Sequence, residues 1–161
     1  MTSSPYRSLP PDRRTALLLH AISNSREARA LYTQRLLARG GGFRAVTLNA
    51  WPADKLAREI VRMKAEQPQD ELDLLHLLYV ELEPAIQIDF LDTARVAHER
   101  GVMPEKLQPP FADENAVRLA AAKVMEQHGA DGLRYLQTLA RYSAVGWPGI
   151  VEVVEKLQQA T

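Results

Sequence analysis

Residues 72–98 read LDLLHLLYVELEPAIQIDFLDTARVAH, and this stretch decides the fold class. At 100° per residue, its apolar side chains fall on one stripe of a helix. The stripe consists of Leu72, Leu75, Leu78, Tyr79, Leu82, Ile86, Phe90 and Ala97. Pro84 removes a backbone donor and crowds the carbonyl of Val80, so a helix must either kink or stop there. Because the stripe keeps its phase across Pro84, we predict one long, proline-kinked helix from about Asp70 to Arg100.

The other periodic segments also favour helices, and no two segments have the alternation of paired strands. Further helices are predicted over about 10–39, 49–67, 113–129, 130–142 and 147–159. Residues 23–25, Ser-Asn-Ser, favour caps and turns and leave open whether 10–39 is one helix or two. Gly129 separates two of the helices, and Leu119 is assigned to the buried face of the first of them. The predicted fold is therefore all-α, an irregular bundle of six or seven helices around the kinked one.

A chain of 161 residues fits one domain on the usual size prior. Residues 1–9 are rich in Ser and Pro without apolar periodicity, so we expect a flexible N-terminal tail followed by a single helical domain over 10–161. Cysteine is absent, which excludes disulfides and thiolate chemistry. No signal-peptide core or membrane-length apolar run occurs, so we expect a cytoplasmic protein with no membrane partner.

The net charge of zero hides an uneven distribution along the chain. Residues 1–66 hold twelve Lys or Arg against five Asp or Glu, a balance of +7. Residues 67–114 hold three against eleven, a balance of −8, and residues 115–161 hold five against four, a balance of +1. The basic segment can pair with the acidic segment of the same chain or with that of a second copy. It can also pair with a separate acidic protein.

Asp89 falls inside the apolar stripe near Leu82 and Ile86, where an unpaired carboxylate would be costly. The first interpretation is a salt bridge from Asp89 to Arg58 or Arg62. The alternative is a carboxylate that lines a ligand pocket. The sequence names Asp89 as a candidate site residue under either interpretation.

Asp73 and His76 lie three residues apart, the spacing used by carboxylate-bridged di-iron bundles. No second acid-x-x-His pair occurs in the chain. We therefore predict no bound metal and no cofactor, and we interpret His76 as a polar residue on the less buried side of its helix.

Arginines are concentrated in the first third of the chain, which raises nucleic-acid binding as a hypothesis. The candidate basic face consists of Arg26, Arg29, Arg35, Arg39 and Arg44. Interleaved acids and the neutral total charge favour a solvated face instead, or one paired with the acidic segment.

Residues 98–107, HERGVMPEKL, resemble the segment that follows the proximal histidine of bacterial globins, and residues 30–43, ALYTQRLLARGGGF, are similar to their second helix. His98 stands one residue nearer to the glycine than in that family, so Ala97 occupies the position of the haem ligand. The resemblance therefore implies a haem-free, globin-like sensor domain that binds a small apolar ligand.

The sequence has no Gly-x-Ser-x-Gly motif and no cysteine nucleophile, so it favours a non-enzymatic function. The leading hypothesis is a helical protein–protein interaction or scaffold module. Segments of opposite charge, together with helices that are apolar on more than one face, predict self-association as a two-fold dimer. A nucleic-acid-binding domain and the sensor domain are the alternatives.

Overall fold

The computed structural model describes residues 3–160 and confirms the all-α class. Within those residues it contains eight α-helices and no strand. Contacts divide the chain into two compact units. The first unit ends at Leu77 and the second begins at Leu78.

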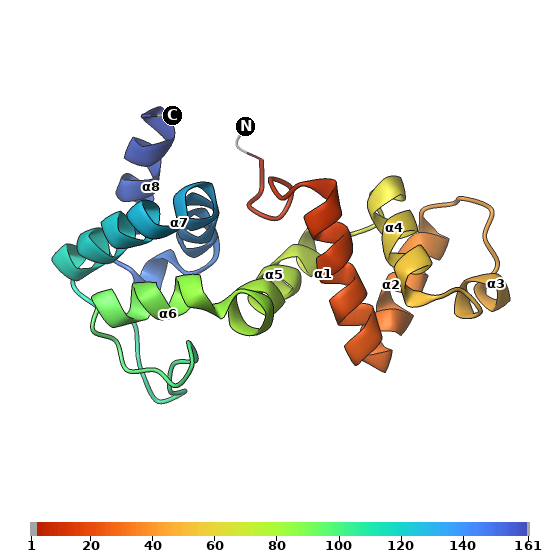
Figure 1. Cartoon of the computed structure of the whole chain (residues 1–161), viewed down its shortest axis with the longest axis horizontal. Helices are drawn as coiled ribbons and strands as arrows, with labels where there is room; N and C mark the ends of the chain where they lie inside the picture. The colour runs from red at the N-terminus through yellow and green to blue at the C-terminus, as the bar shows by residue number, and fades with distance from the viewer. Residues whose placement is uncertain (1–2, 161) are drawn as a thin grey trace. The chain divides into compact units, whose positions relative to one another are not determined.

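The first unit contains five helices, α1 (Pro11–Asn24), α2 (Arg26–Ala38), α3 (Ala45–Asn49), α4 (Ala53–Met63) and α5 (Pro68–Leu77) (Figure 1). Helix α1 packs against α4, α2 and α5, and its buried face meets theirs in one apolar core. That core includes Leu17, Leu18, Leu36, Leu56, Ile60, Leu74 and Leu75. Ser25 separates α1 from α2, and its hydroxyl accepts a hydrogen bond from the Ala28 amide. Residues 23–25 therefore do divide the segment into two helices.

Residues 3–9, part of the segment expected to be a flexible tail, carry two buried side chains. Tyr6 and Leu9 are buried, at 0% and 2% exposure. The Ser- and Pro-rich composition correctly indicates that no helix forms here, but it does not reveal that two large apolar side chains reach the core. Residues 1 and 2 lie outside the described residues.

The helical stretch predicted around Pro84 is present in two parts. Helix α5 continues into a π-helical segment, η1 (Leu78–Leu82), and α6 (Pro84–Thr93) follows. Glu83 between them is not helical, with φ −131° and ψ 62°. Because proline cannot donate and clashes with the preceding turn, the helix stops at Glu83, and Pro84 then occupies the first turn of α6.

Helix α6 ends at Thr93 and does not extend to Arg100. Arg95 has a left-handed backbone with φ +59°, and the Val96 amide donates to the Leu91 carbonyl at 2.9 Å. These are the features of a Schellman motif, in which glycine is the usual left-handed residue. An arginine at that position costs about 1 kcal/mol relative to glycine.

The second unit is built on α6, α7 (Glu114–Tyr142) and α8 (Ile150–Gln159), with a short 3-10 helix, η2 (Ala144–Gly146), before α8 (Figure 1). Helix α7 packs against both α6 and α8. In the core of the second unit, aromatic rings meet edge to face. Phe90 contacts Tyr135 and Trp147, and Tyr79 contacts Tyr135. Such pairs stabilise a core beyond the area they bury.

The break predicted at Gly129 is confirmed, since Gly129 interrupts α7 with φ 55° and ψ −126°. Beyond the break the chain approaches itself closely. A Cβ added to Gly132 would lie 2.6 Å from the Val124 carbonyl oxygen. Glycine is required at the first position by the backbone angle and at the second by the lack of space.

Replacing Gly129 with alanine is expected to lower the unfolding free energy of the second unit by about 1–3 kcal/mol, because the backbone angles there are costly for any residue with a Cβ. Urea denaturation followed by circular dichroism measures the change. The control is Ala130→Ser at an exposed neighbour, which should shift stability by no more than about 0.5 kcal/mol. A Gly129→Ala protein as stable as that control would contradict the prediction.

Candidate functional site

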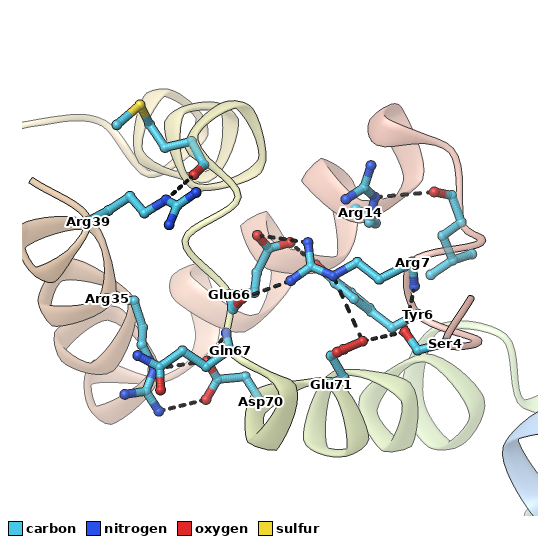
Figure 2. A network of polar contacts seen from close by, with 12 residues as sticks. Ser4, Tyr6, Arg7, Arg14, Arg35, Arg39, Glu66, Gln67, Asp70 and Glu71 are labelled. Carbon is cyan, nitrogen blue, oxygen red and sulfur yellow. Dashed lines mark hydrogen bonds and ion pairs between the residues drawn. The ribbon is translucent and has the colours of Figure 1, made fainter. Parts of the chain in front are cut away.

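Three carboxylates are buried where α4 leads into α5. Glu66, Asp70 and Glu71 have exposures of 3%, 3% and 5%. Buried carboxylates require charged or hydrogen-bonding partners, which here come from the N-terminal segment and from α2 (Figure 2). The sequence pattern did not single out any of the three acids.

The N-terminal segment supplies the partners of Glu66 and Glu71. The Tyr6 hydroxyl donates to Glu66 Oε2 at 2.6 Å, and the Ser4 hydroxyl donates to Glu71. Arg7 donates to the Glu66 carbonyl at 2.7 Å and lies 3.7 and 3.8 Å from the two carboxylates. Burial, and then the neighbouring Glu66, raise the pKa of Tyr6 well above its ordinary value, so its hydroxyl remains a donor.

Asp70 is held by α2. The Arg35 guanidinium donates to both carboxylate oxygens of Asp70 at 2.8 Å, and the Gln67 amide donates to the same carboxylate at 2.9 Å. The hydrogen bonds to Asp70 raise the pKa of Arg35. This cluster therefore joins α2 and the N-terminal segment to the first turn of α5, and its groups are used in holding the unit together.

The arginines of the predicted basic face have different roles. Arg29 donates to the Trp51 carbonyl at 2.7 Å, and Arg39 donates to the Met63 carbonyl at 2.9 Å, so each satisfies carbonyls near the end of a short helix. Arg35 belongs to the Asp70 cluster. Arg26 and Arg44 are exposed and have no ion pair within residues 3–160. Only these two of the five arginines therefore remain available to bind phosphate.

Asp89, for which the sequence offered Arg58 or Arg62, has a partner within its own unit. Its carboxylate lies 2.7 Å from His128 Nε2, a contact that joins α6 to the end of the first half of α7. Arg58 pairs with Asp54 within α4 at 3.2 Å. Arg62 binds both oxygens of Glu59 at 2.7 Å, and these hydrogen bonds lower the pKa of Glu59.

The two candidate histidines belong to different units. His76 is exposed in the last turn of α5. His98 Nε2 lies 2.6 Å from Asp92, and its Nδ1 accepts a hydrogen bond from the Gly101 amide at 3.0 Å. Since Nδ1 accepts, the ring proton is on Nε2, and both nitrogens are engaged. Among the described residues, no three His, Asp or Glu side chains are grouped as metal ligands.

An open groove of about 670 Å³ lies along α7 in the second unit. Its lining comes from the end of α6 and from the first half of α7, namely Thr93, Arg95, Asp113, Asn115, Ala116, Leu119, Ala122, Lys123 and Glu126. The α7 positions recur every three or four residues and so form one stripe of that helix. Leu119, assigned to the core from the sequence, is 66% exposed in this stripe.

The opposite face of α7 explains the exposure of Leu119. Val117, Ala120, Ala121 and Val124 are at most 1% exposed and already fill the core. The helix thus carries apolar residues on two faces, and the protein buries only one of them. An exposed leucine between two alanines leaves a shallow apolar floor that a second helix can approach closely.

Comparison of the chain with protein-family models, with curated proteins and with solved structures finds no match. Along residues 3–160, no helix has the length and apolar character required to cross a membrane.

Proposed function

We propose that this protein is a non-enzymatic helical interaction module that self-associates through the groove of its second unit. The observation that carries the proposal is Leu119, 66% exposed on the floor of a groove that is lined by Ala116 and Ala122. A leucine on a helix face with small neighbours is typical of helix–helix contacts.

The charges around the groove favour a second copy as the occupant. Two cations, Arg95 and Lys123, and two acids, Asp113 and Glu126, line it, so its formal charge is zero. A strongly acidic or basic partner would meet like charges on this lining, whereas a copy of the same surface offers equal numbers of both.

Nucleic-acid binding is less favoured by the same reasoning. Three of the five arginines of the predicted face already bind protein groups, which leaves Arg26 and Arg44 in a region that also holds the buried Glu66, Asp70 and Glu71. A cytoplasmic location accompanies the proposal as an expectation.

Sedimentation velocity over about 1–200 µM tests the proposal. An interface formed by one helix face fits a dissociation constant on the order of 10 µM. As the protein concentration increases, the average mass should therefore rise from the 18.0 kDa of the monomer toward the mass of a dimer. Leu119→Glu places a charge in the apolar contact and should weaken association at least about tenfold.

The matched control is Val145→Glu. Val145 is 80% exposed in the same unit but does not line the groove, so this variant should associate like the unmodified protein. A mass of 18.0 kDa for the unmodified protein across the range would refute the proposal. Equal loss of association in both variants would place the contact outside the groove.

A further inference from the structure

Helix α6 and the first half of α7 run in opposite directions. Asp89, in the middle of α6, contacts His128, which lies just before the break at Gly129. Arg95, just beyond the end of α6, lines the groove together with Asp113 and Asn115 at the start of α7. The groove therefore has a first end, marked by Arg95 and Asp113, and a second end, marked by Lys123 and Glu126.

Each end of the groove thus carries one cation and one acid. Arg95, Lys123 and Glu126 form no ion pair within the part of the chain that the structure describes. Asp113 caps α7 by accepting a hydrogen bond from the Ala116 amide. If the first end of the groove in one copy lies against the second end in another copy, each unpaired charge of the groove faces an opposite charge.

Resting on the proposed self-association, we infer that two copies pair their α7 stripes antiparallel about a two-fold axis near Leu119, with Arg95 of one copy bound to Glu126 of the other. Two-fold symmetry repeats this contact, so the interface contains two Arg95–Glu126 pairs. Lys123 of each copy then faces the Asp113 end of its partner. The leucines meet at the axis, and the small side chains of Ala116 and Ala122 allow the helices to approach.

The backbone of Arg95 is consistent with this role. Its left-handed conformation, with φ +59°, is one that glycine adopts without cost, yet the residue here is an exposed arginine. Lys64 at the end of α4 has the same conformation, with φ +51°, and does not line the groove. Lys64 therefore offers a control with the same backbone strain and no place in the proposed interface.

Charge reversal tests the pairing. In a homodimer of Arg95→Glu, both contacts bring together two acids, and in a homodimer of Glu126→Arg both bring together two cations. Each variant alone should dimerise at least about tenfold more weakly than the unmodified protein. In an equimolar mixture, each contact of the heterodimer again joins one acid and one cation.

The expected result is that labelled Arg95→Glu protein binds unlabelled Glu126→Arg protein within about threefold of the unmodified affinity, while it binds unlabelled Arg95→Glu protein weakly. Lys64→Glu should leave dimerisation unchanged. Circular dichroism melts of each variant separate loss of association from loss of folding.

Three outcomes would overturn the inference in distinguishable ways. If Leu119→Glu disrupts the dimer but mixing the reversed variants restores nothing, the groove remains the contact surface and the antiparallel pairing is wrong. If the unmodified protein stays a monomer, the proposed self-association fails as well. If a synthetic acidic helical peptide binds the monomer and depends on Arg95, the occupant is another protein and not a second copy.

Discussion

Raising the pH from 9 to 11 is expected to destabilise each unit by about 3 kcal/mol. Four of the five tyrosines are buried, Tyr6 and Tyr32 in the first unit and Tyr79 and Tyr135 in the second. Burial is the largest cause that raises the pKa of each above its ordinary value.

The direction of the effect follows from the unfolded state. An unfolded tyrosine ionises near pH 10, whereas the folded pKa is raised. The contribution to stability is therefore fully present below about pH 10 and is lost as the pH rises toward the folded pKa. Each buried tyrosine then costs about 1.4 kcal/mol between pH 9 and pH 11, and each unit holds two of them.

Urea denaturation at a series of pH values measures the loss, and the ultraviolet absorbance of phenolate reports ionisation. Phenolate should appear together with unfolding. Tyr135→Phe removes one titrating group and should halve the alkaline loss in the second unit only. Ionisation of all the tyrosines near pH 10 in a protein that remains folded would contradict the prediction.

Asp70→Ala is expected to lower the unfolding free energy of the first unit by about 3 kcal/mol. Asp70 is 3% exposed. Loss of its carboxylate leaves the Arg35 guanidinium and the backbone N–H of Gln67 without their acceptor. Urea denaturation of the variant measures the change.

Two further variants define the cause. Asp54→Ala removes a carboxylate whose pair with Arg58 has both side chains more than half exposed, so its effect should be below about 1 kcal/mol. The double variant Asp70→Leu/Arg35→Met removes both charges and should recover much of the loss. If Asp70→Ala costs no more than Asp54→Ala, the buried pair does not stabilise the unit as argued.

Local backbone preferences marked the helix boundaries, but they did not settle every outcome. The end of a helix at Gly129 was predicted, the break at Ser25 was left open, and Pro84 was predicted to kink a helix that stops there instead. In each case the deciding property belongs to the residue itself, a side-chain acceptor, a missing backbone donor or a freely accessible left-handed conformation. Such properties can be read from one sequence.

Only part of the candidate site could be predicted by the same reasoning. Asp89 was recognised as requiring a partner, but the sequence offered Arg58 or Arg62, and the partner is His128, 39 residues away. Leu119 belongs to a correctly predicted helix and was placed on its wrong face. Periodicity could not separate the two faces, because α7 has apolar residues on both.

The sequence by itself determined the all-α class and the interruption at Gly129, because helical periodicity and backbone preferences act within a few residues. It left the break at Ser25 open and predicted only a kink at Pro84, where the helix stops. Only the tertiary structure decided that Tyr6 is buried against Glu66, 60 residues away, and that Leu119 faces solvent. Both outcomes depend on which surfaces meet when distant segments pack, and the free energy of that packing is a property of the assembled core rather than of any local stretch.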